Sequence, residues 1–161
     1  MKKEAAPQEK VLTEQLVVFS LGEQYYGVNI FSVQEIIRID HLTPVPRTPS
    51  FVQGIINLRG KIIPVIDLKK RFNCSREMAA TGEERIIVIE AQGTVMGMMV
   101  DQVTEVISVP RSQLGVPLQI GEGKVAGLLK AVIPRGDGMI MLLDMEKVFC
   151  SLQKEQKDNI A

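Results

Sequence analysis

The sequence predicts a mainly β protein in which two related small barrels, each with five strands, pack together. Three observations lead to this prediction. The sequence repeats itself at a shift of 70 residues, β-branched residues fill the repeated segments, and short turn-forming stretches separate them. Each half of the 161-residue chain is near the size at which a hydrophobic core becomes marginal, so we expect the two halves to pack against each other.

The internal repeat aligns residues 16–37 with residues 86–107 without a gap. Later blocks match at slightly larger shifts, as loop insertions would produce, with 62–68 over 139–145 and Phe72 over Phe149. Several blocks in the same order indicate a duplication more strongly than any single identity does. Within the first block the identical pairs are Val18 and Val88, Gly27 and Gly97, Val33 and Val103, Glu35 and Glu105, and Ile37 and Ile107.

The first elements of the repeat are predicted to be strands. Apolar and β-branched residues fill 16–21 and 24–30, and Gly22-Glu23 supplies the turn between them. The following segment, 34–39, fits either a strand or one helical turn followed by a strand, because periodicity does not separate these over so few residues.

The second part of the repeat contains a loop, two strands and a short helix. The proline-rich segment 44–49 is predicted to be an ordered loop, because proline donates no hydrogen bond to a sheet ladder. Strands over 54–58 and 62–67 are joined by a tight turn in which Gly60 can take a positive φ. A short helix over 68–72 follows. We expect the aspartates before this helix and before its copy to cap the helix N-termini, which is worth about 1 kcal/mol each.

The repeat predicts how the chain is divided. A flexible N-terminal tail covers 1–11, the first barrel covers about 12–75, and the second barrel covers about 84–150, with exchanged elements allowed. The polar stretch 73–84 is the candidate link, and 153–161 is a C-terminal tail. Barrels are expected because closure removes the exposed edges that an open five-stranded sheet would carry.

Composition limits the classes of partner. The 19 basic and 19 acidic residues balance, so there is no electrostatic reason to expect nucleic acid or an anionic membrane. No apolar signal segment follows the N-terminus, and no stretch approaches the roughly 18 apolar residues of a membrane span. Cys74 and Cys150 are predicted to be buried or half-buried free thiols. We therefore expect a soluble cytoplasmic protein without direct membrane insertion.

Catalytic and metal-binding patterns lack their parts. His41 is the single histidine, which leaves no partner for a cysteine nucleophile or a structural zinc site. Segment 54–61 resembles a phosphate-binding loop, but its glycines are too far apart and Ile62 replaces the required hydroxyl residue. Asp67 and Asp144 lack the small residues that follow the paired aspartates of aspartic proteases. We predict no enzyme activity and no cofactor or metal.

Distinctive motifs occupy the blocks 26–37, 46–49, 54–60 and 64–68, and in the second repeat 97–106. Taken together, these motifs resemble the CheW-like domain family of bacterial chemotaxis. The resemblance covers about 12–152. It implies SH3-like barrels and a stand-alone adaptor or scaffold, which couples methyl-accepting chemoreceptors to the histidine kinase CheA in membrane-receptor arrays by protein–protein binding only.

The resemblance implies two binding surfaces. The seam between the barrels would take the cytoplasmic hairpin tip of a chemoreceptor, and the CheA regulatory domain would bind barrel against barrel. The isolated chain would be a monomer, and pairing through pseudo-symmetric surfaces also allows closed rings in arrays. The predicted receptor-binding groove contains Val28, Ile30, Val33, Ile36, Val100 and Val103, for each of which core packing is the alternative. The predicted kinase-binding surface contains Pro46, Phe51, Val52 and Gly54.

Two charged residues stand inside apolar blocks of the motif. Glu35 and Arg59 recur in the second repeat as Glu105 and Arg135, and a charge in such a block is unexpected without a partner. We predict that Glu35 and Arg59 form a pair. The competing interpretation of the chain is a small-β-barrel module that binds nucleic acid or another ligand. Such a module needs a basic groove or exposed aromatic residues, and this chain has two tyrosines, five phenylalanines and no tryptophan.

Overall fold

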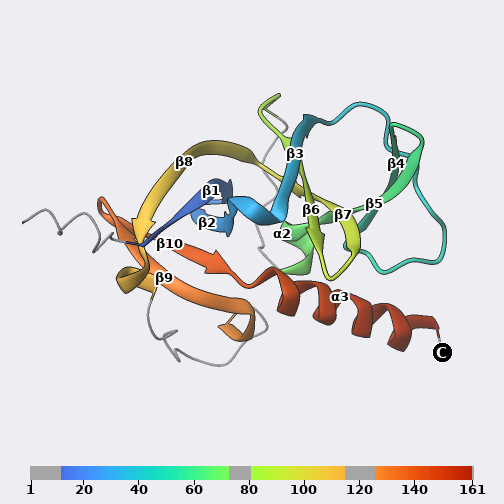
Figure 1. The fold of residues 1–161 in the computed structure, drawn as a ribbon. Helices are drawn as coiled ribbons and strands as arrows, with labels where there is room; N and C mark the ends of the chain where they lie inside the picture. The colour runs from blue at the N-terminus through green and yellow to red at the C-terminus, as the bar shows by residue number, and fades with distance from the viewer. Residues whose placement is uncertain (1–11, 73–80, 115–125, 161) are drawn as a thin grey trace, which may run out of the picture.

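The computed structural model describes residues 12–72, 81–114 and 126–160. It contains two five-stranded sheets that lie side by side, with a C-terminal helix that starts between them (Figure 1). The mainly β fold with two five-stranded sheets is therefore confirmed.

Each sheet draws its strands from distant parts of the chain. Sheet 1 has the order β8-β1-β2-β10-β9 and sheet 2 has the order β3-β6-β7-β5-β4. The strands of sheet 1 are β1 (Thr13–Leu21), β2 (Gln24–Asn29), β8 (Gln102–Pro110), β9 (Leu129–Arg135) and β10 (Gly138–Leu143). The strands of sheet 2 are β3 (Val33–Arg38), β4 (Val52–Leu58), β5 (Lys61–Asp67), β6 (Arg85–Ala91) and β7 (Thr94–Val100).

The two sheets exchange hairpins between the sequence repeats. The β1–β2 hairpin of the first repeat lies in sheet 1 beside strands of the second repeat, and the β6–β7 hairpin of the second repeat lies in sheet 2. Each hairpin joins its neighbour through a parallel pairing, β2 with β10 and β7 with β5. The predicted barrel boundary near 75 lies within residues 73–80, which are outside the described residues, and both this boundary and the one near 84 stay a prediction.

Helices occur at the ends of strands. A 3-10 turn, η1 (Ile30–Ser32), precedes β3, so the segment 34–39 is largely strand and its helical turn comes earlier. The helix α2 (Leu68–Arg71) follows β5, and α3 (Met145–Ile160) follows β10 and continues through most of the predicted C-terminal tail. Two further 3-10 turns are η2 (Arg111–Leu114) and η3 (Ala126–Leu128).

Both predicted helix caps are confirmed. The carboxylate Oδ1 of Asp67 accepts hydrogen bonds from the backbone N–H groups of Lys69 and Lys70, at 2.9 and 3.4 Å. Asp144 does the same for the first turn of α3, at 3.1 and 3.3 Å. These bonds satisfy N–H groups that the helix itself leaves unpaired.

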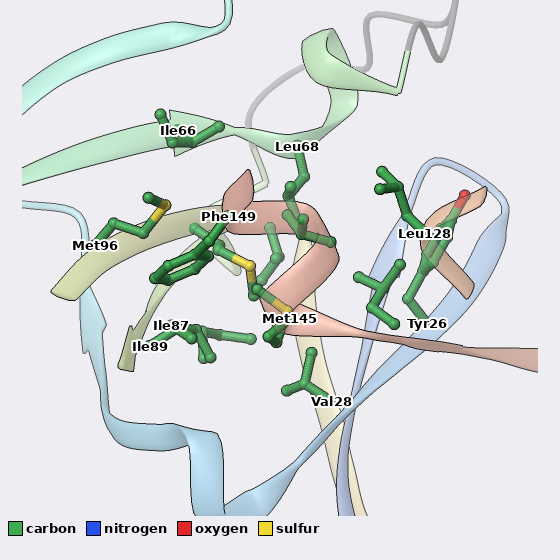
Figure 2. Close-up of a cluster of buried hydrophobic side chains, with 14 of the residues drawn as sticks. Tyr26, Val28, Ile66, Leu68, Ile87, Ile89, Met96, Leu128, Met145 and Phe149 are labelled. Carbon is green, nitrogen blue, oxygen red and sulfur yellow. The ribbon is translucent and has the colours of Figure 1, made fainter. Parts of the chain in front are cut away.

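One hydrophobic core lies between the two sheets and belongs to both. We call it the central core, and Figure 2 shows Met145 and Phe149 of α3 among side chains from both sheets. Phe72 and Phe149, which end the two repeats, are both buried in it. Tyr26 stacks on Phe19, with ring centroids 6.1 Å apart, and meets Phe72 in a tilted contact, with ring centroids 5.6 Å apart.

Each sheet also encloses a smaller core of its own. The strand β1 serves two cores, because Leu16 and Val18 face the core of sheet 1 while Val17 and Phe19 face the central core. In β6, Ile86 and Val88 face the core of sheet 2, while Ile87 and Ile89 face the central core. Burial on both faces explains why these strands read as unbroken apolar runs rather than alternating ones.

The prediction of a buried or half-buried Cys150 is wrong, because this free thiol is exposed. The buried residues of α3 recur at Met145, Val148, Phe149 and Leu152, a helical spacing that places position 150 on another face. Cys74 lies outside the described residues.

The repeated glycines Gly27 and Gly97 provide a matched test of packing. A β-carbon at Gly97 would lie 2.6 Å from Cγ2 of Ile86, whereas one at Gly27 would lie 3.3 Å from Cγ2 of Ile140. Since Ile86 is fully buried and branched, it has little room to move. We expect Gly97→Ala to lower the free energy of unfolding by about 1–3 kcal/mol and Gly27→Ala by less, measured by urea denaturation. Equal losses would show that this close approach does not set the cost.

Candidate protein-binding surfaces

The structure brings Glu35 and Arg59 together in a two-pronged ion pair. Nη1 of Arg59 donates to Oε2 of Glu35 at 2.7 Å, and Nη2 donates to Oε1 at 3.1 Å. Arg59 lies in the β4–β5 turn, where it and Gly60 have φ values of +53° and +86°. The positive φ expected at Gly60 is therefore confirmed. Asn57 steadies the turn, because its side-chain oxygen accepts from the N–H of Gly60 at 2.8 Å.

The second repeat forms the same pair in the other sheet, between Glu105 and Arg135. Glu35 and Glu105 lie on β3 and β8, and each of these strands is one edge of its sheet. Their arginines lie at the ends of β4 and β9, the opposite edges. Among the described residues no ladder joins the two edges of either sheet. Each ion pair therefore links the two opposite edges of its own sheet.

These pairs place charge at the surface rather than provide stability. The Arg59 side chain is 77% exposed and that of Glu35 is 24% exposed. An exposed ion pair contributes about 0–1 kcal/mol, because water screens the charges and the side chains lose freedom. The geometry instead fixes the guanidinium in one orientation, with its exposed side toward solvent.

The six predicted groove residues occupy different depths. Val28 and Val100 are 0% and 1% exposed and belong to the central core. They could therefore affect a contact only by packing beneath the residues that touch the partner. Ile36 is 40% exposed. The other three are half-buried and pack against the edge of the central core, and we call them the apolar rim: Ile30, Val33 and Val103.

The apolar rim crosses from one sheet to the other. Val33 lies on β3 of sheet 2 and Val103 lies on β8 of sheet 1, at matching positions of the two repeats. Both pack against the same central core. The two sheets therefore share one core, and a groove at their seam stays a prediction.

The four predicted kinase-binding residues also differ in exposure. Pro46 is exposed and Val52 is half-buried. Phe51 is 6% exposed, its ring lies 5.8 Å from the Arg71 guanidinium, and its carbonyl accepts from the N–H of Asp67 at 2.7 Å. Phe51 therefore fixes β4 to the start of α2.

The backbone geometry at position 54 requires glycine. Gly54 has a φ of +151°, and a β-carbon there would lie 2.3 Å from the carbonyl oxygen of Thr43. This close approach lets Thr43 pair with Ile55 through two backbone hydrogen bonds of 3.0 and 2.8 Å. The segment before the proline-rich loop thus covers the outer edge of β4.

Sequence reasoning selected Ile36 but missed the other exposed apolar side chains around it and elsewhere. Phe31 is 93% exposed, next to the apolar rim. Two repeat-related pairs are also exposed, Ile36 with Val106 and Ile62 with Met139, at 40 to 61%. The repeat alignment could have identified these pairs, because in each pair an apolar residue recurs at the equivalent position of the two repeats.

The described part of the chain shows no group of three histidine, cysteine or carboxylate side chains that could hold a metal ion. His41 is 95% exposed and lies 3.6 Å from Asp40. No helix among the residues searched has the length and apolar character needed to cross a membrane.

The fold and these surfaces define a class of protein: a duplicated two-sheet β module that presents an apolar rim and oriented charges of the kind used in contacts with other proteins. Residues 15–153 match the CheW-like domain, and the chain belongs to this family. The resemblance seen in the sequence motifs is thus confirmed. Membership places the chain among chemotaxis scaffolds and adaptors, a family that is not catalytic.

Individual relatives agree with this membership. The chain is 33% identical over 149 residues to the chemotaxis protein CheW of Treponema pallidum, covering 91% of this chain and 88% of the relative. It is 32% identical to CheW of Klebsiella aerogenes, covering 92% and 89%. The crystal structure of the scaffolding protein TtCheW from Thermoanaerobacter tengcongensis is similar with a TM-score of 0.76 and 39% identity, covering 83% of this chain and 86% of that one.

The covered edge of β4 yields a prediction. We expect Gly54→Ala to lower the free energy of unfolding by about 2 kcal/mol or more, because the new methyl group clashes with Thr43 and the backbone favours glycine. Gly138→Ala is the matched control, since a β-carbon there meets no atom within 4 Å. Urea denaturation of both variants provides the measurement. Similar small losses would mean that the edge can shift to accept a side chain.

Proposed function

We propose that this chain is a cytoplasmic adaptor that couples methyl-accepting chemoreceptors to the histidine kinase CheA in membrane-receptor arrays, by protein binding alone. Membership in the CheW-like domain family supports the class of function. The single observation that carries the proposal is the apolar rim, whose residues on η1, β3 and β8 are partly buried and pack against the one central core. It supplies partly exposed apolar side chains where the two sheets meet.

The receptor-binding surface is proposed at this rim. A helix that docks in a groove binds mainly through apolar anchors, and partly buried side chains on fixed strands provide a preformed site for them. Ile36 extends the surface on β3, and Val28 and Val100 hold it from below. The occupant is the cytoplasmic hairpin tip of a chemoreceptor.

The kinase-binding surface is proposed along β4 and the loop before it. Pro46 and Val52 present apolar surface there, Phe51 and Gly54 fix the backbone, and Arg59 presents an oriented charge at the end of the strand. The occupant is the CheA regulatory domain. In this proposal the adaptor is a monomer in isolation and forms rings with the kinase domain in arrays.

The oriented charge gives the first binding prediction. We expect Arg59→Glu to weaken binding of the CheA regulatory domain about tenfold, or ~1.4 kcal/mol, because it reverses a charge at the contact and places two carboxylates together. Calorimetric titration measures the affinity, and urea denaturation should show stability changed by no more than about 1 kcal/mol.

Arg135→Glu is the matched control for this titration, because it removes the equivalent ion pair in the other sheet. It should bind with nearly wild-type affinity. If both variants lose binding equally, or neither does, the kinase surface is not at Arg59.

The part of the proposed receptor surface that Ile36 adds to the apolar rim gives the second binding prediction. We expect Ile36→Glu to weaken binding of a soluble receptor fragment that carries the hairpin tip at least tenfold, because a carboxylate cannot be buried against the fragment without a partner. Ile36 is 40% exposed, so the fold should survive the change. Surface plasmon resonance with the immobilised fragment measures the affinity.

Met139→Glu serves as the control for the rim, because Met139 is 45% exposed and lies on β10. It should bind the fragment normally. Binding of Ile36→Glu at wild-type affinity would show that the receptor surface does not include this part of β3.

A further inference from the structure

The chain passes between the sheets at two equivalent places that are built differently. It passes from β2 to β3 through η1, and it passes from β7 to β8 through Asp101. The repeat alignment places Asp101 over Phe31. Phe31 is 93% exposed, whereas the Asp101 side chain is 20% exposed and held by several contacts.

Both carboxylate oxygens of Asp101 are engaged. Oδ1 lies 2.8 Å from Nζ of Lys69, and Oδ2 accepts a hydrogen bond from the backbone N–H of Gly22 at 2.7 Å. The backbone N–H of Asp101 donates to the carbonyl of Ser20 at 3.1 Å. The Lys69 side chain is only 21% exposed, so this ion pair is much better shielded than the pair at Arg59.

These contacts join elements of different sheets. Ser20 and Gly22 belong to the β1–β2 hairpin of sheet 1, whereas Lys69 is on α2 at the end of a sheet 2 strand. The hydrogen bond to Asp101 raises the pKa of Lys69, as expected when a nearby carboxylate stabilises the charged form of the lysine. Asp101 is thus a cross-link between a turn of sheet 1 and a helix of sheet 2.

The same cross-link connects the two proposed binding surfaces. On one side, α2 is fixed to β4 by the hydrogen bond from Nζ of Lys70 to Oε1 of Gln53 at 3.0 Å and by the Asp67–Phe51 backbone bond. On the other side, Asp101 immediately precedes β8, and Val103 of the apolar rim follows two residues later.

We propose that Lys69 and Asp101 are positioning residues that fix the start of β8, and with it the Val103 end of the apolar rim, relative to α2 and β4. At the equivalent place in the other repeat, Phe31 replaces the aspartate and Glu146 replaces the lysine, and the cleft there has about 510 Å³ against about 230 Å³ around Asp101. Of the two crossings between the sheets, the one at Asp101 therefore has this ion-pair cross-link and the one at Phe31 does not. The consequence for receptor binding rests on the proposed function.

The test compares Asp101→Ala and Lys69→Met with two controls in the full chain. Lys69→Arg keeps the charge, and Asp137→Ala removes an exposed aspartate from the β9–β10 turn. Hydrogen exchange of backbone amides, read residue by residue by NMR, reports the cross-link directly. We expect Asp101→Ala to raise the exchange rate of the Gly22 amide at least tenfold, with a smaller rise for Lys69→Met and none for either control.

Receptor-fragment affinity is the second measurement. We expect Asp101→Ala and Lys69→Met to weaken binding about three- to tenfold. The control variant Lys69→Arg should retain wild-type affinity. A double variant should lose no more than the worse single one, because both residues act through one contact.

The outcomes separate the two proposals. An unchanged Gly22 exchange rate in Asp101→Ala overturns the cross-link, whatever the partners do. Faster exchange with undiminished receptor affinity overturns the positioning role. If the wild-type chain itself does not bind the fragment, the proposed function fails, while faster exchange would still support the cross-link between the sheets.

Discussion

Hydrophobic burial between the two sheets holds this molecule together, because the central core takes side chains from both sheets and from the last helix. The strands β1 and β6 are buried on both faces, so each also closes the small core of its own sheet. A change in either strand would therefore disturb two cores at once. The binding surfaces depend on the same constraint, since the apolar rim is the edge of the central core.

Much of the fold could be predicted from local chemistry. The unbroken apolar runs predicted strands, Gly60 predicted a turn, and the aspartates directly before predicted helix starts predicted helix caps. The hairpin exchange could not be assigned, because the two hairpins are repeats with nearly the same pattern of side chains. Short crossovers decide it: η1 and the single residue Asp101 carry the chain directly into the other sheet.

The site was predictable in part, for a related reason. Glu35 and Arg59 stood out because a charge in an apolar block needs a partner, and the structure pairs them. Apolar residues gave no such signal, because the burial of an apolar side chain depends on which core its face of the strand packs against. Val28 and Val33 look alike in sequence, yet one is fully buried and the other lies at the rim. The exposure of Phe31 follows from its place on a crossover turn, which the pattern did not locate.

The exchange of hairpins has a consequence for how the chain reaches its structure. Neither repeat contains all the strands of one sheet, and the pairing of Thr13 with Pro110 joins distant parts of the sequence. Such long-range pairings fold slowly, because loop closure costs entropy before the contacts form. During synthesis the β1–β2 hairpin has no sheet to join until β8 and β10 emerge. Until then its apolar edge can pair with the late strands of another copy, which is the geometry of domain swapping.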